Sequence, residues 1–134
     1  MARLSAAAAT ATRVRVLASG LSPASGLPTD PGAVLFRRDG VAHVTAVLDA
    51  IDIDDARSGD HCLCTGYPVV QFLDGNGQTV VTLGCHHGRA LRWQAWQGDA
   101  TLTERSAGEL CEWFAGHGCR EPKDELEESR RQGR

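Results

Sequence analysis

The feature that most constrains this fold is a pair of short apolar runs separated by a strong turn signal. Residues 69–73 and 79–83 are rich in β-branched side chains, which favour extended strands. Between them, residues 74–77 read Asp-Gly-Asn-Gly, a combination that tolerates the positive φ angles of tight turns. The pattern predicts an antiparallel β-hairpin. Such a hairpin brings the residues before its first strand close to the residues after its second.

Cysteine and histidine residues gather at both ends of this predicted hairpin. Cys62 and Cys64 precede the first strand, and Cys85, His86 and His87 follow the second. We therefore expect the two groups to be neighbours in space. Two thiolates with two ligands from the second group would complete a tetrahedral set of sulfur and nitrogen atoms. Zinc is the usual ion for such a set, with copper(I) or iron as alternatives, so the sequence predicts a metal site.

The same residues also allow other interpretations. Cys62 and Cys64 could form a thiol redox pair, or the whole group could be structural. Adjacent histidines on an extended backbone point to opposite sides of it, which favours one ligand from His86 and His87 over both. His61 is a further candidate ligand in the same loop.

The other cysteines and histidines are better explained as ordinary structural residues. Cys111 falls in a predicted helix beside apolar side chains and, like Cys119, is expected to act as a small buried hydrophobe. His43 and His117 are expected at the surface or at helix ends. Five cysteines are an odd number and they are clustered, which fits a reducing compartment better than a disulfide framework.

Arg92 is the predicted ligand-binding residue. Residues 90–96 are expected to form a third strand, in which alternation places Arg92 on the opposite face from Trp93. Trp93 is expected in the core, which leaves Arg92 on the face that looks toward a ligand. A guanidinium group beside a metal site could orient a small anion.

The remaining patterns complete an α+β domain. Residues 41–51 carry apolar side chains at helical spacing, with Asp39 as the expected N-cap. Residues 106–115 predict a second helix, introduced by Thr103. Residues 33–38 are expected to be a strand or an extended lead into the first helix. Together these elements predict a small antiparallel sheet, a meander of about three strands, with two flanking helices.

The two ends of the chain are expected to lie outside this domain. Residues 1–32 begin with an alanine-rich stretch and end in a run of prolines and glycines, and they predict a flexible leader followed by a linker. Residues 120–134 are strongly charged and predict a solvated tail or a frayed helix. The expected domain therefore spans residues 33–119.

Composition excludes several classes of protein. The formal net charge of −3 argues against a general nucleic-acid binder, because such proteins carry a basic excess or a basic face. The chain has no apolar stretch of about 18 residues, which excludes a membrane-spanning helix. Its 134 residues suit one domain. We expect a cytoplasmic bacterial protein.

One ordered pattern runs through the centre of the chain, on Cys62, Cys64, Gly66, His86, His87, Gly88, Arg92, Trp93 and Trp113. This order of Cys-x-Cys-x-Gly, hairpin, His-His-Gly, Arg-Trp and a closing helix with tryptophan resembles a group of small uncharacterised bacterial proteins. The resemblance covers residues 41–118, just over half of the chain. It implies that Cys85, Cys111 and Cys119 lie outside the shared pattern, which shifts the expected ligands toward both histidines. It implies no particular activity.

The sequence thus predicts a small metal-binding module of unknown role, with zinc held by Cys62, Cys64, His86 and His87. One alternative is a non-catalytic interaction or immunity-type protein, in which these residues are structural and the Arg-Trp strand belongs to a partner surface. Another is a thiol redox protein that uses Cys62 and Cys64. A metal-bound water beside Arg92 would give a hydrolase-like site, but no general base is evident, so catalysis stays undecided. The expected partners are a protein or a small anion.

Overall fold

The predicted hairpin is present at the centre of the fold. The computed structural model describes residues 1–59 and 64–133. The hairpin strands are β3 (Val69–Asp74) and β4 (Thr79–His86), which are joined by a tight turn. The Asp74 carboxylate supports this turn, because its Oδ1 accepts hydrogen bonds from the amides of Asn76 at 2.9 Å and Gln78 at 3.0 Å.

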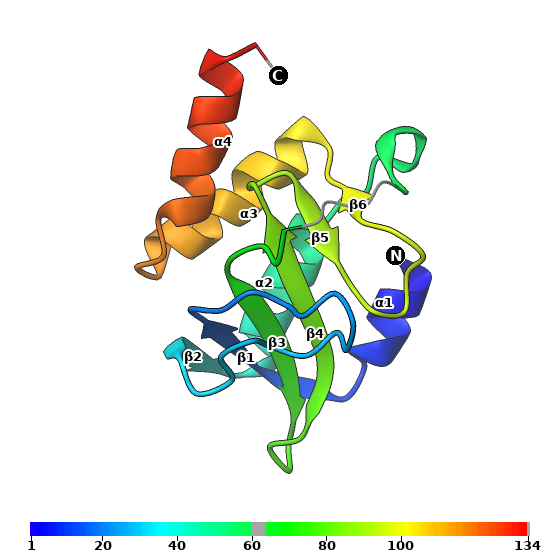
Figure 1. Cartoon of the computed structure of the whole chain (residues 1–134). Coiled ribbons are helices and arrows are strands. Elements are labelled where there is room, and N and C mark those ends of the chain that lie inside the picture. The colour runs from blue at the N-terminus through cyan, green and yellow to red at the C-terminus, as the bar shows by residue number, and fades with distance from the viewer. Residues whose placement is uncertain (60–63, 134) are drawn as a thin grey trace.

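The described strands form one six-stranded sheet with the order β2-β1-β3-β4-β5-β6, and every neighbouring pair is antiparallel (Figure 1). The α+β class is therefore confirmed, although the sheet is larger than the predicted meander and four described helices accompany it. The predicted third strand ends early, because the amide of Trp96 donates to the carbonyl of Trp93 in a turn. The strands beside the hairpin are β1 (Ala11–Leu17), β2 (Val34–Asp39), β5 (Ala90–Arg92) and β6 (Ala100–Thr101).

The prediction of a flexible leader is wrong for β1, which lies inside the sheet between β2 and β3. Val14 and Val16 of this strand are fully buried, whereas Arg13 and Arg15, which alternate with them, lie on its other face and are only partly buried. This alternation is the period of a strand with one face in the core. The partner β3 comes more than fifty residues later in the chain, so the local pattern carries no sign of it.

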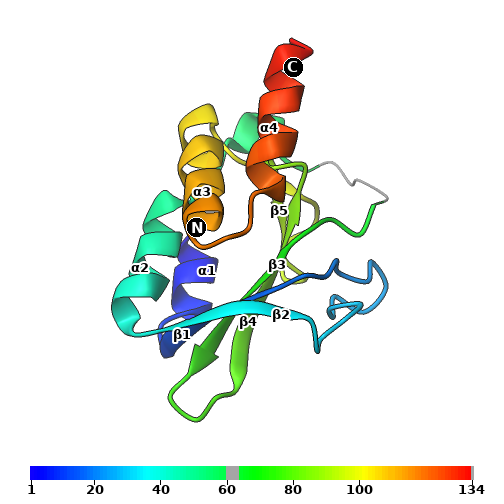
Figure 2. The same cartoon turned by 90° about the vertical axis from the view of Figure 1, so that its left-hand side faces the viewer.

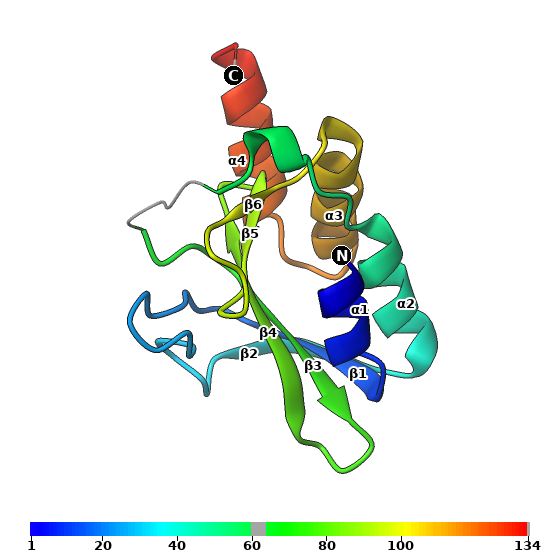
Figure 3. The same cartoon turned by 90° about the vertical axis from the view of Figure 1, so that its right-hand side faces the viewer.

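Helices cover one face of the sheet, and the irregular segment 18–33 covers part of the other (Figures 2 and 3). Leu4, Val47 and Phe114 reach from three helices into the core, where each is at most 1% exposed. None of the described helices is long and apolar enough to cross a membrane. The three helices on this face are α1 (Ala2–Ala7), α2 (Val41–Ala50) and α3 (Glu104–Gly116).

Both predicted helices are present, and their caps differ from each other. Thr103 is the N-cap of α3, and its hydroxyl accepts a hydrogen bond from the Ser106 amide at 3.2 Å. The expected cap of α2, Asp39, is instead the last residue of β2, and Gly40 occupies the cap position without a side-chain bond. The Asp39 carboxylate pairs with Arg13 of the neighbouring strand at 3.4 Å. This carboxylate therefore contributes an ion pair within the sheet and does not cap the helix.

The charged segment after α3 forms a helix, α4 (Glu121–Arg131), so of the two predicted alternatives the helix is present and the solvated tail is not. Its one large apolar residue, Leu126, is 2% exposed and lies against Gly88 in the turn after β4. Arg130 also pairs with Glu104 of α3 at 3.3 Å. Two buried side chains, Leu126 and Pro122, and a few ion pairs therefore dock a helix whose composition alone suggests a solvated segment.

Candidate metal centre

Cys64 and the two predicted histidine ligands meet at one end of the hairpin. The Cys64 sulfur lies 3.1 Å from Nδ1 of His86 and 3.5 Å from Nε2 of His87, both within hydrogen-bond range for sulfur. The proximity that the hairpin predicts is therefore present for these three residues. Cys62 and His61, the other candidates from this loop, lie outside the described residues.

Backbone pairing just beyond the hairpin brings this loop to the histidines. The Tyr67 amide donates to the carbonyl of Cys85 at 2.8 Å, and the Cys85 amide donates to the carbonyl of Pro68 at 3.0 Å. On its other side the loop is held by segment 18–33, since the Leu21 amide donates to the carbonyl of Thr65 at 2.8 Å. Main-chain hydrogen bonds thus hold the residues that directly follow Cys64 from two sides.

Gly66 allows the loop to approach the histidine closely. Its φ is +75°, a conformation that favours glycine. A Cβ atom at this position would lie 2.4 Å from the carbonyl oxygen of Cys85 and 2.9 Å from the His86 ring. No side chain fits there, so the Gly in the Cys-x-Cys-x-Gly pattern has a direct packing reason.

His86 is the buried member of the group, with 2% of its surface exposed. Burial lowers the pKa of its imidazole to about 4, because desolvation disfavours the charged ring, and the Arg92 guanidinium lowers it further by repulsion. The ring is therefore neutral at pH 7. Its Nε2 has no hydrogen-bond partner among the described residues, so the contact of Nδ1 with Cys64 is its principal polar interaction there.

His87 reaches the same sulfur because the chain turns sharply after β4. His87 has φ +55° and Gly88 has φ +69°, and the Arg89 amide donates to the carbonyl of His86 at 3.0 Å. Two central residues with positive φ are the signature of a type I′ turn. The adjacent histidines therefore do not alternate as they would in a strand, and both rings face Cys64.

The exposed His87 also contacts α4 through its second nitrogen. Nδ1 of His87 lies 3.4 Å from Oε2 of Glu125, while Nε2 faces the Cys64 sulfur. The three side chains form a chain of contacts from carboxylate to imidazole to sulfur. Glu125 is not among the predicted site residues, because residues 120–134 read as a charged tail or a frayed helix and no local pattern points this residue toward the turn.

Arg92 is engaged by a carboxylate within the fold. Its Nε donates to Oδ1 of Asp99 at 2.7 Å and its Nη2 to Oδ2 at 3.0 Å, and the two side chains are only 12% and 7% exposed. Its Nη1 donates to the backbone carbonyl of Cys64 at 3.0 Å. These contacts give Arg92 a positioning role for the loop, and anion binding by Arg92 stays a prediction.

Asp99 is not among the predicted site residues, although the sequence does contain a pattern that indicates its pairing with Arg92. Leu91 pairs with Ala100 across β5 and β6, so the same register places Arg92 opposite Asp99. Reading residues 90–101 as a second hairpin would have predicted this ion pair, because opposite charges on facing positions stabilise a strand pair.

The other cysteines lie in the core, as expected for Cys111 and Cys119. Cys85, Cys111 and Cys119 are each at most 3% exposed and are free thiols. Burial raises the pKa of the Cys111 and Cys119 thiols to about 12, and it raises the pKa of the Cys85 thiol further. These thiols are therefore protonated at pH 7 and poor ligands for a metal in their present environment.

The remaining histidines contact each other on the helical side of the molecule. The rings of His43 and His117 have centroids 6.2 Å apart, and His117 stacks on Phe36 at 5.3 Å. Nδ1 of His117 contacts the carbonyl of Trp113 at 2.8 Å at the end of α3. His117 therefore lies at a helix end, as expected, and His43 lies half-buried in the first turn of α2.

In this structure the Cys64 sulfur forms hydrogen-bonded contacts with the two histidines. Among residues 1–59 and 64–133, no group of three or more Cys, His, Asp or Glu side chains has an arrangement that could hold a metal ion. Bonds of about 2.3 Å to sulfur and about 2.0 Å to nitrogen place tetrahedral zinc ligands roughly 3.5 Å apart. The Cys64–His87 separation of 3.5 Å matches this value, and the Cys64–His86 separation of 3.1 Å is shorter.

Comparisons with known proteins add no further support. No family model matches the chain, and no curated protein or solved structure is significantly similar to it. The resemblance to small bacterial proteins with the same order of motifs therefore stays a prediction. The function is therefore inferred from the geometry of the described residues.

Proposed function

We propose that this protein binds a transition-metal ion, zinc by preference, through Cys64, His86 and His87. The observation that carries this proposal is the approach of two imidazole nitrogens to one sulfur, at 3.1 Å and 3.5 Å. A thiol has one proton and can donate it to only one of them. A divalent ion in place of that proton would bond to all three atoms after small side-chain rotations.

The protonation state of His86 supports this role. A histidine must be neutral to bind a metal, and the pKa of about 4 keeps the buried ring neutral at physiological pH. Binding at His86 therefore requires the removal of no proton from this ring at pH 7. The thiol proton of Cys64 is the one that a metal would displace.

Outer contacts support the same set of ligands. Metal-bound histidines usually donate their second N–H to a carboxylate or a carbonyl, which fixes the ring. Glu125 occupies that place beside Nδ1 of His87. The guanidinium of Arg92 holds the Cys64 carbonyl, so the residue carrying the thiolate is also fixed.

Metal analysis of protein purified without a histidine tag tests the proposal. We expect close to one equivalent of zinc, and a sulfur-to-metal charge-transfer band when cobalt(II) replaces it. Cys64→Ser, His86→Gln and His87→Gln should each weaken binding strongly. His43→Gln removes a histidine on α2 and serves as the matched control, which should bind zinc like the wild type.

Two results would contradict a metal role for Cys64, His86 and His87. The metal role would be excluded by wild-type protein that retains less than about a tenth of an equivalent of metal and takes up none from micromolar zinc. Equal loss of zinc in His43→Gln and in His86→Gln would show that the metal binds at the surface without using this site.

Thiol chemistry at Cys64 is a second candidate, favoured by the contacts from Glu125 through His87 to the sulfur. A nucleophile, a base and a carboxylate that orients the base form a common arrangement in thiol catalysis. In chelator-treated protein, this candidate predicts rapid alkylation of Cys64 by iodoacetamide, slowed by His87→Gln. Zinc that protects Cys64 completely would favour the metal role, and slow alkylation in both proteins would exclude the thiol role.

The remaining expectations concern the context of this site. A reducing compartment, the cytoplasm in particular, would preserve a thiolate ligand and the buried free thiols. The interaction or immunity-type role, the redox role of Cys62 with Cys64, and a protein or anionic partner stay predictions.

A further inference from the structure

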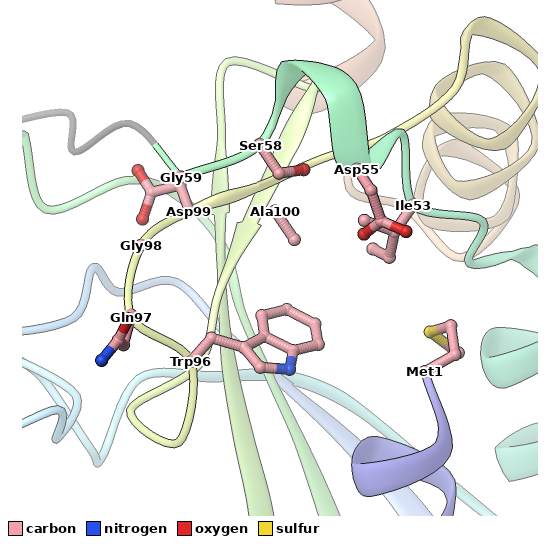
Figure 4. A pocket seen from close by; sticks show the side chains of 10 residues that line it. All are labelled: Met1, Ile53, Asp55, Ser58, Gly59, Trp96, Gln97, Gly98, Asp99 and Ala100. Atoms are coloured by element: carbon pink, nitrogen blue, oxygen red, sulfur yellow. The ribbon is translucent and has the colours of Figure 1, made fainter.

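The hollow in Figure 4 lies away from the three proposed ligands, beside the turn between β5 and β6. It is lined by that turn, by the segment around the short 3₁₀ helix η1 (Asp55–Arg57) and by Met1. The α-ammonium group of Met1 offsets the Asp55 carboxylate, so the two charges together favour neither a cation nor an anion. The turn after β4 is different, because it connects the proposed metal site to a helix.

Helix α4 is docked on the turn that carries His87 (Figures 1 and 2). Nδ1 of His87 lies 3.4 Å from Oε2 of Glu125, and Nε of Arg89 donates to the hydroxyl of Ser129 at 2.8 Å. Glu125 and Ser129 are four residues apart, so they lie on one face of the helix. That face of α4 therefore contacts the turn on both sides of Gly88.

Gly88 itself brings the turn into close contact with α4. A Cβ atom on this glycine would lie 2.5 Å from the carbonyl oxygen of Pro122 and 3.1 Å from Cβ of Leu126. It would also lie 3.2 Å from the sulfur of Cys111, a buried residue of α3. The turn, α3 and α4 thus meet at Gly88, and the residue before this glycine is a proposed metal ligand.

The contacts of α4 with the rest of the fold are mostly at the surface. The helix buries two side chains, those of Pro122 and Leu126. Its ion pair with α3, between Arg130 and Glu104 at 3.3 Å, is exposed, and exposed pairs contribute little to stability. Elements with few buried contacts open locally at a lower free energy than core strands do. A change in the turn can therefore affect how often α4 opens.

We propose that metal binding at Cys64, His86 and His87 stabilises the docked position of α4, so that the metal-free protein opens this helix more often. This inference rests on the proposed metal role. A metal ion on Nε2 of His87 keeps the proton of the ring on Nδ1, where it is donated to Glu125. The positive charge of the ion also strengthens a hydrogen bond to an anionic carboxylate. Because this bond exists only while α4 is docked, the metal favours the docked state.

Hydrogen–deuterium exchange of the α4 amides, with and without saturating zinc, tests this coupling. Zinc should slow their exchange about tenfold, the low end of the effects of contacts that support metal ligands, because the contact between His87 and Glu125 is exposed. The zinc content of each sample is measured in parallel.

Two variants of α4 separate this contact from general stabilisation. Any ion that binds only the folded chain slows exchange through global unfolding, whichever residues it contacts. With saturating zinc, Glu125→Gln should therefore keep that general effect and lose the additional slowing in α4. Glu127→Gln removes the same charge from the same helix and should keep both. Neither carboxylate is buried, so both variants should fold.

Three results would overturn this inference. Zinc that binds fully and leaves the exchange of α4 unchanged would exclude the coupling while leaving the metal role intact. Equal slowing in Glu125→Gln and Glu127→Gln would show that His87 does not transmit the effect to α4. Absence of bound zinc would contradict both this inference and the proposed metal role, and the measured zinc content distinguishes that case from the other two.

Discussion

Gly66 determines how closely the loop that carries Cys64 can lie against the histidines. We expect Gly66→Ala to lower the free energy of unfolding by about 3 kcal/mol, because positive φ is strained for alanine and its Cβ would overlap the Cys85 carbonyl. Gly77→Ala is the matched control, since Gly77 has φ +81° and open space around it. It should cost only about 1 kcal/mol. Urea unfolding of the two variants measures both values.

The two glycine variants separate backbone strain from close packing. Equal destabilisation by Gly66→Ala and Gly77→Ala would mean that the approach of the loop to His86 adds nothing to the cost. A larger loss for Gly66→Ala should also be accompanied by weaker zinc binding, because the substitution pushes Cys64 away from the histidine rings.

His86 should make the stability of the metal-free protein depend on pH. Burial lowers its pKa from the ordinary 6.5 to about 4, so between these values the unfolded chain takes up a proton that the folded chain does not. Stability should therefore fall as the pH decreases from about 6.5 to about 4, and His86→Gln should remove this part of the dependence. Urea unfolding at several pH values in chelator measures it. The same slope in both proteins would contradict the prediction.

At the scale of elements, the turn after β4 and helix α4 together support His87. The turn rotates His87 toward Cys64, and α4 brings Glu125 to its other nitrogen. The turn and α4 therefore give His87 an orientation that an extended strand could not give it, since adjacent residues of a strand face opposite sides. This support depends on Leu126, which holds α4 against the turn.

Under the proposed metal role, Glu125 on α4 should tune the affinity for zinc. We expect Glu125→Gln to weaken zinc binding about tenfold, because the His87 ring loses the carboxylate that orients it. Glu127→Gln removes the same charge from the same helix and is the matched control. Competition with a zinc chelator measures both affinities. Equal losses in the two variants would indicate a general charge effect, without a role for the contact with His87.

At the scale of the whole molecule, β1 joins the N-terminal part of the chain to the sheet. A chain that lacks residues 1–32 would leave β2 and β3 without the strand that lies between them. It would also expose buried core residues such as Val70 and Phe72 of β3. We expect this shortened chain to be unfolded, as circular dichroism and the dispersion of its amide signals would report. Cooperative unfolding of the shortened chain would contradict the prediction.

The best predictions from sequence were those in which a local pattern carries its own structural signal. The β3–β4 hairpin has both β-branched strands and a glycine-rich turn, and α3 has a capping threonine and an apolar face. The approach of Cys64 to His86 followed from the hairpin alone, because antiparallel pairing joins its ends. In such elements the interactions that favour the structure are made between residues that are close together in the sequence.

The weakest predictions concerned the two ends of the chain and the surroundings of the site. Arg13 and Arg15 alternate with buried valines in β1, yet the strand exists only because β2 and β3 lie on either side of it. Leu126 is one apolar residue in a charged stretch, and its burial depends on cover from the turn at Gly88. Local composition does not indicate which distant segments of the chain will pack against a given stretch.

The residue types at the site, and the approach of Cys64 to the end of the hairpin that carries the histidines, were thus predictable from the linear chain. Only the tertiary structure decided that both rings face one sulfur and that His86 is buried and neutral. The physical reason is that pairing within a hairpin is local. Burial, charge pairing and ring orientation depend on which distant elements pack against it.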